Sequence, residues 1–577
     1  MIYYYAMEDK ILPIKEKVAP VRKDEVRVLS LGGSEDVTRN MYLYEYNDEI
    51  LIVDCGLGFP DETMLGVDLL LPDISYLLDV VKKGKKKIVG MVLTHGHEDH
   101  IGGIPFILPQ LPQFPVYASP LTAALTNAKL EDFRLPRSIK TAKFTDNEIK
   151  LGSFKVSFVR VTHSVPDSAN IIIKTPIGNL FHGSDFKFDF TPADGKRTEF
   201  LKITKAAEEG ILCLMSDCLG SERSGFSPSE QMLGQNFERE MRECLGKFII
   251  TTYSSNIARV NQVIEAAERL NRKVCFVGRS VIKVKEIGQQ LGYLKMRPGT
   301  EVEIKDVKKL KSNQVVLLVA GSQGQANSAL TRIAEGEHKD IRLDPSDVVV
   351  FSSDTIPGNE ISVNGLVGSI SKRGSRVVQS TSAGGSFHVS GHGSSGDHML
   401  LVALTQPKFL LPISGTYRHM VDYRTMAENM GYKRKDIFLI ENGQEVIFTK
   451  ESARFGKRFH INNVFVDGVS GEELEHFVVR DRERLGKEGV IIVMAEINVS
   501  DGQLAAKPII VARGSAMTDT REMTASLMQE INKILSIRKE KVTNWMHIRK
   551  LIGQTVERNL FKKLKSRPLV LPVVIEV

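Results

Sequence analysis

The sequence predicts a mixed α/β protein with several domains, and two patterns along the chain support this. From Val26 onward, short apolar runs rich in β-branched residues alternate with polar loops, which is typical of strands. Between residues 228 and 345, helical patterns alternate with such runs, which indicates a parallel sheet. The length of 577 residues fits two to four domains, and 42% hydrophobic residues suffice for a sizeable core.

Changes in these patterns divide the chain into segments. Residues 1–24 are charged and show no periodicity, so we expect a mobile N-terminal arm. Residues 448–464 are also strongly charged and predict a linker. The other segments are residues 25–210, 211–346, 347–447 and 465–577.

Four of the strand-like runs end in polar residues. These runs cover residues 49–56, 88–97, 154–163 and 178–186. The polar residues at their ends are Asp54, the cluster His95–His100, His163 and Asp185. Stacked in sheets, these strand ends would converge on one rim, where a metal ion could bind.

The cluster reads H-x-H-x-D-H and carries the strongest chemical signal in the chain. Imidazole and carboxylate ligands without thiols suit zinc, manganese or iron. Alternate residues His95 and His97 can face one ion. Asp99 and His100 follow the turn and can face a second ion.

Two residues from later strands complete the pattern. His163 can join the first ion, and the carboxylate of Asp185 can bridge two ions about 3.5–4 Å apart. Such a pair lowers the pKa of bound water towards ~7 and stabilises charge on a displaced oxygen. Isolated histidines are more often structural, and we expect no metal at His182, His338, His460, His476 and His547.

Composition limits the compartment and the partners. The five cysteines are odd in number and show no C-x-x-C pairing, which favours a reducing cytoplasm over disulfides or a cysteine-based zinc site. No apolar run approaches the ~18 residues of a membrane helix, and the N-terminus does not resemble a signal peptide. The net charge of +7 permits a polyanionic partner.

The motifs resemble a known family. H-x-H-x-D-H, then "THS", then "GSDF", is the metallo-β-lactamase hydrolase pattern. The segments "THSVPDS", "GSDFKFDFTP", "IPGNE", "FHVSGHG" and the ending "RPLVLPVVIEV" resemble ribonuclease J, the bacterial β-CASP branch of these nucleases. The resemblance implies a metallo-β-lactamase αββα sandwich in two parts, over 25–210 and 347–447. It also implies an inserted β-CASP domain over 211–346 and a small C-terminal α/β domain over 465–577.

The resemblance also implies an activity and a ligand set. Ribonuclease J enzymes degrade RNA from the 5′ end, favour a single-stranded 5′-monophosphorylated substrate, can cut internally, and act in mRNA decay and rRNA maturation. It implies one zinc ion on His95, His97 and His163. A second zinc ion would bind Asp99 and His100, with Asp185 bridging, and Mn²⁺ is possible. Asp54 would organise the site.

The segment "HVSGH" resembles the RNA-binding motif of the family and covers His388, Val389, Ser390, Gly391 and His392. The resemblance places His388 beside the scissile phosphate as a general acid or electrostatic group, together with Asp185 and Asp99 as catalytic residues. Ser390 and Gly391 leave little side chain, so backbone N–H groups can approach a phosphate.

Two departures from the family pattern affect the site. In "SDCLGSERSG" Asp217 is kept, but Cys218 and Leu219 replace small hydroxyl residues. In "LPISGTYRHM" Ser414 stands where the family has the last histidine ligand of the second metal, and Thr416 replaces a glutamate. We therefore expect a weakened second zinc site. The alternative is a catalytically weak subunit that binds RNA or an active paralogue; a small-molecule hydrolase would have no use for the β-CASP segment.

The C-terminal region is rich in positive charge. Between Lys533 and Arg567 there are 11 basic residues and two acids, Glu540 and Glu557. This is either a solvated helix face or a surface that attracts the RNA backbone. The resemblance implies a homodimer or higher oligomer through this domain and possible association with an RNA-degradation complex or the ribosome, with no membrane partner.

Overall fold

The computed structural model describes residues 24–61, 64–146, 148–356, 358–380, 386–467, 473–501, 503–515, 520–536 and 545–577. Apart from Asp24, the expected N-terminal arm lies outside these residues. The chain divides into two compact units, one with Met1–Gly58 and Leu71–Asn463 and one with Phe59–Leu70 and Val464–Val577. Within the described ranges, no helix is long and apolar enough to cross a membrane.

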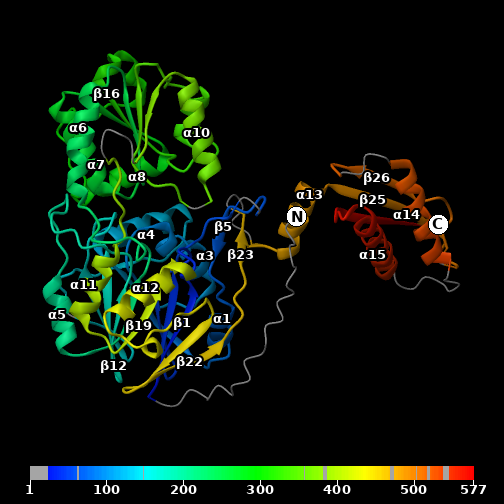
Figure 1. Cartoon of the computed structure of the whole chain (residues 1–577), viewed down its shortest axis with the longest axis horizontal. Helices are drawn as coiled ribbons and strands as arrows, with labels where there is room; N and C mark the ends of the chain where they lie inside the picture. Colours follow the sequence, from blue (N-terminus) through cyan, green and yellow to red (C-terminus); the bar gives the residue numbers. More distant parts are fainter. Residues whose placement is uncertain are drawn as a thin grey trace. The chain divides into compact units, whose positions relative to one another are not determined.

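Two stacked sheets form one half of the first unit (Figure 1). The larger sheet runs in the order β22 (Ala453–Arg458), β21 (Gln444–Phe448), β1 (Val26–Gly32), β3 (Met41–Tyr46), β4 (Glu49–Val53), β6 (Lys87–Leu93), β7 (Val116–Ala118), β8 (Lys140–Thr141). The smaller sheet runs in the order β19 (Phe409–Ile413), β13 (Ile211–Asp217), β12 (Gly178–Gly183), β11 (Ala169–Thr175), β10 (Phe154–Arg160), β9 (Ile149–Leu151).

Alternating residues of β4 explain how the layers form. Ile50 and Ile52 belong to one hydrophobic core, which helices cover, whereas Leu51 and Val53 belong to the core between the two sheets. The outer helices on the larger sheet are α1 (Ser75–Lys82), α3 (Ile104–Ile107) and α4 (Pro120–Asp132). Those on the smaller sheet are α5 (Phe200–Glu208), α11 (Ser395–Thr405) and α12 (Tyr417–Asn429). The expected αββα sandwich is confirmed.

A parallel five-stranded sheet forms the other half of this unit (Figure 1). Its order is β15 (Lys273–Val277), β16 (Val315–Val319), β14 (Phe248–Thr251), β17 (Val348–Phe351), β18 (Arg376–Val378). One face packs against α6 (Leu233–Glu243), α7 (Ile257–Arg269) and α8 (Arg279–Gln290). The other packs against α9 (Ala329–Glu335) and α10 (Glu360–Lys372). The predicted β–α alternation is therefore a sheet covered on both faces.

Two expected boundaries differ from the structure. Strand β13 pairs with β12 in the sandwich, so the inserted sheet starts after residue 211. Strands β17 and β18 belong to the five-stranded sheet, so the inserted sheet continues past residue 346. A fully buried parallel strand is apolar throughout, so its sequence does not reveal which sheet it joins. Within the expected linker, 448–464, strand β22 forms the edge of the larger sheet; its charges reflect an exposed edge.

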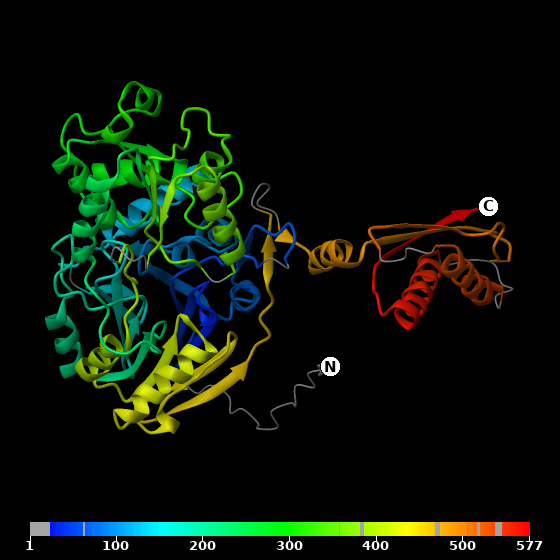
Figure 2. The same cartoon turned by 45° about the horizontal axis from the view of Figure 1, so that its top comes forward.

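The second unit contains two three-stranded sheets (Figure 2). The smaller one joins β24 (Glu473–Leu474), β23 (Val464–Val466) and β5 (Leu69–Leu71). The larger one joins β26 (Ile509–Arg513), β25 (Val490–Ile497) and β27 (Leu569–Glu576). The helices are α13 (His476–Glu488), α14 (Thr520–Ser536) and α15 (Trp545–Leu564). Alternate residues of β25, such as Ile491 and Val493, form a core with α14 and α15.

Candidate active site

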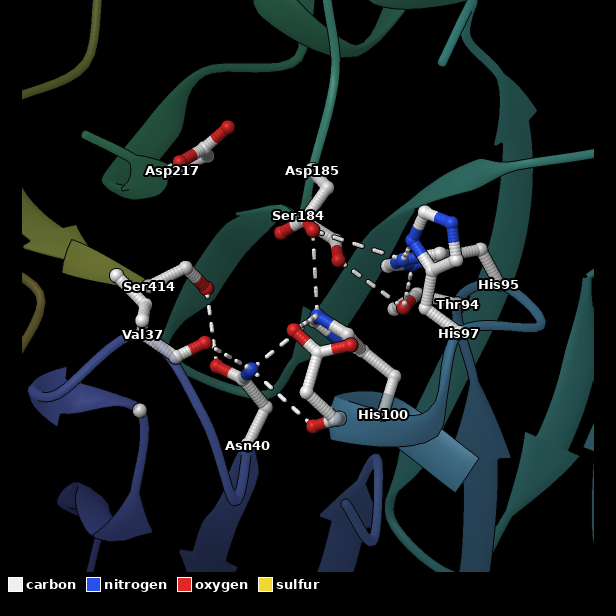
Figure 3. A network of polar contacts seen from close by, with 12 residues as sticks. Val37, Asn40, Thr94, His95, His97, His100, Ser184, Asp185, Asp217 and Ser414 are labelled. Atoms are coloured by element: carbon white, nitrogen blue, oxygen red, sulfur yellow. Dashed lines mark hydrogen bonds and ion pairs between the residues drawn. The ribbon is translucent and has the colours of Figure 1, made fainter. Parts of the chain in front are cut away.

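The structure brings the predicted polar strand ends together on one rim (Figure 3). Strand β6 ends at Leu93, and the turn after it carries His95 and His97. The short helix α2 (Glu98–Ile101) follows and carries Asp99 and His100. The remaining two members, His163 and Asp185, follow strands β10 and β12 of the facing sheet.

His95, His97, His163 and Asp185, here called the first set, lie close enough to share one ion. The Nδ1 atom of His97 is 3.1 Å from Nε2 of His95 and 3.1 Å from Nε2 of His163. The Oδ2 atom of Asp185 is 3.5 Å from His95 Nε2 and 3.8 Å from His163 Nε2.

These separations suit a four-coordinate divalent cation. Four ligands placed about 2.0–2.1 Å from a zinc ion in a tetrahedron lie roughly 3.3 Å from one another. In addition, Oδ1 of Asp185 is buried and has no hydrogen-bond partner within the described part of the chain. A buried carboxylate oxygen without a partner is costly unless a cation or water satisfies it. The first set therefore fits a metal ion.

Protonation in the first set also favours metal binding. Burial lowers the pKa of His97 to about 3. Burial likewise holds the pKa of His95 and of His163 well below the ordinary value. These imidazoles are therefore neutral at pH 7, which is the form that binds a metal. The Nδ1 atom of His163 lies 2.7 Å from the carbonyl oxygen of Gly391, so this nitrogen carries the proton and Nε2 remains free as a ligand.

Asp99, His100 and Asp185, here called the second set, share Asp185 with the first. The Nε2 atom of His100 lies 3.7 Å from Oδ2 of Asp99 and 3.4 Å from Oδ2 of Asp185. Its Nδ1 atom donates to Oδ2 of Asp54 at 2.8 Å. Asp54 also accepts hydrogen bonds from the backbone and hydroxyl of Thr94, at 2.8 and 2.7 Å. Asp54 thus orients both the turn and His100, as expected.

Ser414 lies beside the second set but does not extend it. Its hydroxyl donates to Oδ1 of Asn40 at 3.0 Å (Figure 3). The amide nitrogen of Asn40 in turn lies 3.2 Å from Nε2 of His100. The position of Asn40 could not be predicted from the sequence, because a lone asparagine before a strand carries no recognisable signal.

The "HVSGH" segment reaches the first set through its second histidine. Nε2 of His392 lies 3.7 Å from Oδ2 of Asp185, and its ring packs edge-on against His163 at 5.1 Å. Nδ1 of His392 lies 2.8 Å from Oδ2 of Asp217. Burial opposes protonation of His392, but the carboxylates of Asp217 and Asp185 outweigh it and raise its pKa to about 9.

His388, which was expected beside the reacting phosphate, is held by other groups. Its Nδ1 atom accepts from Nη1 of Arg259 at 2.9 Å, and its Nε2 atom lies 3.2 Å from Oδ2 of Asp354. Val389 is buried, and its carbonyl accepts from Arg259 Nη2 at 3.1 Å. These two residues therefore anchor the segment, and the position next to the first set belongs to His392.

The turn at Ser390 and Gly391 lies close to the first set. A Cβ atom on Gly391 would be 2.7 Å from Cε1 of His163, so only glycine lets the backbone approach this closely. The hydroxyl of Ser390 accepts from the backbone N–H of His392 at 3.1 Å and lies 3.3 Å from Nη2 of Arg223. Arg223 thus adds a positive charge at the turn, and no local sequence pattern indicates this contact.

A buried ion pair supports this segment from the side of the five-stranded sheet. Arg259 of α7 is fully buried and pairs with Glu230, with Nη2 and Oε1 2.5 Å apart. Its Nη1 atom donates to the carbonyl of Ser352 at 2.6 Å. In the sequence, Arg259 resembles an ordinary exposed helix arginine, so only tertiary structure reveals its role.

Three family descriptions match the chain. "Metallo-beta-lactamase superfamily" matches residues 35–192, "Ribonuclease J, beta-CASP domain" matches 245–370, and "Ribonuclease J C-terminal domain" matches 477–577. A solved structure titled as a protein of unknown function from Enterococcus faecalis V583 shares the fold, with a TM-score of 0.53 at 16% identity over 74% of this chain and 100% of that chain.

Curated relatives match nearly the full length. Ribonuclease J 1 of Streptococcus pyogenes serotype M3 is 36% identical over 96% of this chain and 98% of its own length. Ribonuclease J2 of Bacillus subtilis is 34% identical over 96% and 99%, and ribonuclease J of Thermus thermophilus is 35% identical over 96% and 96%. With this similarity and a His/Asp cluster that can bind metal, the chain belongs to the ribonuclease J family of metal-dependent ribonucleases.

Proposed function

We propose that this protein hydrolyses single-stranded RNA from a 5′-monophosphorylated end in the 5′ to 3′ direction, and that it can also cut internally. The observation that carries this proposal is the convergence of the first set with the "HVSGH" turn, where His163 lies 2.7 Å from the carbonyl of Gly391. The first set would bind a cation, and the adjacent "HVSGH" turn would present backbone N–H groups and positive charge to a phosphate. We also propose roles in mRNA decay and rRNA maturation in the cytoplasm, which the same family membership supports.

The first set would hold the catalytic cation, which we propose is Zn²⁺, with Mn²⁺ as a substitute. When bound, the ion supplies an activated water and stabilises negative charge on the phosphate oxygens. Asp185 and the three imidazoles hold it at the rim. Asp99, at the start of α2, orients the attacking water by accepting its hydrogen bond.

His392 acts as the general acid in this proposal, in place of His388. Its Nδ1–H donates to Asp217, which fixes the ring and leaves Nε2 facing the first set, 3.7 Å from Asp185 Oδ2. A protonated Nε2 can donate to the oxygen that leaves when the phosphodiester bond breaks. His388 acts on substrate only through the position it gives to the turn.

The terminal phosphate would bind at the turn itself. Ser390 offers a hydroxyl, Gly391 lets the backbone come close, and Arg223 supplies a guanidinium that pairs well with phosphate oxygens. A 5′ triphosphate brings additional bulk and charge to the same space. We therefore expect a preference for the monophosphate.

Oligomerisation would use the outer face of the C-terminal sheet. Leu571, Val573 and Ile575 of β27 are between 43% and 45% exposed, and Ile509 of β26 is 57% exposed. In register, Met494 of β25 lies between Val573 and Ile509, so these side chains share one face. Such an exposed apolar sheet face fits a second copy of the chain, and the resulting oligomer could join an RNA-degradation complex or the ribosome.

One assay tests the proposal. Purified protein is incubated with 5′-monophosphorylated single-stranded RNA, with and without a chelator, and with the 5′-triphosphorylated equivalent. We expect chelator-sensitive release of mononucleotides, faster from the monophosphate. Cleavage that survives exhaustive chelation would exclude the metal-dependent mechanism. Equal rates on the monophosphorylated and the triphosphorylated RNA would exclude recognition of the 5′ phosphate at the turn.

The contact between Ser414 and Asn40 favours a second candidate function. Because this contact lies at the second set, the chain could be a catalytically weak subunit that holds RNA or an active paralogue. In the same assay, that candidate predicts RNA binding without cleavage at saturating zinc or manganese.

A further inference from the structure

Asn40 places its amide nitrogen beside the ring nitrogen through which His100 would bind a metal ion. Nδ1 of His100 donates its proton to Asp54, so Nε2 is the ring nitrogen that could bind an ion. The amide nitrogen of Asn40 lies 3.2 Å from this atom, within hydrogen-bond distance (Figure 3). One lone pair accepts one proton or binds one cation, so an ion at His100 must take the place of any hydrogen bond from Asn40.

Asn40 is held in this position from both ends of its amide. Its Oδ1 atom accepts hydrogen bonds from the hydroxyl groups of Ser414 and Tyr42, both at 3.0 Å. Its Nδ2 atom lies 3.2 Å from the carbonyl oxygens of Val37 and Asp99. The side chain is fully buried, so no solvent water can replace these partners without rearrangement.

Ser414 therefore has two effects on the second set. Its short hydroxyl provides no imidazole nitrogen, and it hydrogen-bonds the amide that competes for His100. The residue is itself fixed, because its backbone N–H donates to Gly33 at 2.7 Å and it is 2% exposed. What remains for an ion in the second set is Asp99 and a shared Asp185, which is a poor set for zinc.

We propose that Asn40 and Ser414 close the second set against a metal ion, so that this chain holds one ion tightly, in the first set. The inference rests on the proposed metal dependence of the first set. It predicts that a second ion binds at least ~10–100-fold more weakly than the first, since losses outside the ligand shell alone have effects of that size.

The test counts ions in the full chain. Wild-type protein, Ser414→His and Asn40→Asp are loaded with Zn²⁺, dialysed, and measured for zinc per chain by mass spectrometry and for binding by calorimetry. Ser414 has φ of +54°, a conformation in which histidine is enriched, so Ser414→His suits the backbone. Asn40→Asp keeps the shape of the side chain but cannot donate to His100. Ser414→Ala is the matched control, because it removes the hydroxyl without adding a ligand.

We expect one retained ion in wild type and in Ser414→Ala, and a second in Ser414→His or Asn40→Asp. The inference is overturned if wild type retains two ions or none, or if both ligand-adding variants retain one while their thermal unfolding matches wild type. RNA cleavage is scored separately. If wild type retains one ion but does not cleave RNA, the proposed function is wrong and this inference stands. If wild type retains two ions and cleaves RNA, this inference is wrong and the proposed function stands.

Discussion

Asp217 and His392 form a hydrogen bond of 2.8 Å between residues 175 positions apart, beside the first set. The bond fixes one ring nitrogen and leaves the other directed at Asp185, 3.7 Å away. This pairing of a carboxylate with an imidazole is the arrangement that orients a general acid.

We expect Asp217→Asn to reduce RNA cleavage by about 10²-fold, because a general acid typically contributes 10²–10⁴-fold and an amide holds the ring less well. His392→Ala should reduce it at least as much. The double variant should be no slower than His392→Ala alone, since the two residues act as one unit. Single-turnover rates measure this. Additive losses in the double variant would show that Asp217 acts independently of His392.

The buried pair of Glu230 and Arg259 should give the protein a defined acid sensitivity. Burial opposes ionisation of Glu230, but Arg259 outweighs it and lowers the pKa of the carboxyl below its ordinary value. A lowered pKa adds stability that is present above about pH 4.5 and is lost as the pH falls through the folded-state pKa. Glu230→Gln leaves Arg259 buried without a counter-charge, which typically costs about 3–5 kcal/mol.

Denaturant midpoints of wild type and Glu230→Gln, measured from pH 7 to pH 3, check this expectation. The two midpoints should differ most at pH 7 and approach each other in acid. Glu238→Gln is the control, because its partners Arg242 and Arg269 lie on the surface, and it should change the midpoint far less. A gap that stays constant with pH would refute the assigned role of the pair.

The convergence of the His/Asp cluster could be predicted from the sequence because its signal is local. His95, His97, Asp99 and His100 lie within six positions, and His163 and Asp185 each follow an apolar strand. Strand periodicity places such residues at one rim without knowledge of the whole fold. The αββα sandwich followed from the same runs once the family pattern was recognised.

The remaining site features depend on contacts that local patterns do not contain. Ser414 and Asn40 meet across 374 positions, and nothing near either residue indicates the other. His388 and His392 are equivalent in the sequence, and only the positions of Arg259 and Asp217 show which of them faces the first set. Tertiary packing, and not residue type, therefore determines which of the two histidines lies next to the first set.

His97→Ala should abolish RNA cleavage and lower zinc retention while leaving the protein folded. Its Nδ1 atom lies 3.1 Å from both neighbouring imidazoles, so its loss removes the central member of the first set, and the residue lies at the rim, outside the hydrophobic cores. Zinc content, cleavage and thermal unfolding are measured together. His460→Ala is the matched control at an exposed position and should change none of them. Full cleavage by His97→Ala would show that the first set is not catalytic.

The exposed face of the C-terminal sheet predicts a dissociable oligomer. Val573→Lys places a charge among Leu571, Ile575 and the neighbouring strands, where burial of an unpaired ammonium is unfavourable. We expect light scattering to give the mass of an oligomer for wild type and of a single chain for Val573→Lys. Lys562→Glu, at an exposed position of α15, is the control and should keep the oligomer. Cleavage per chain should persist in Val573→Lys, because every residue of the first set comes from the other unit. If wild type is a single chain at micromolar concentration, the predicted oligomer is wrong and this face binds another partner.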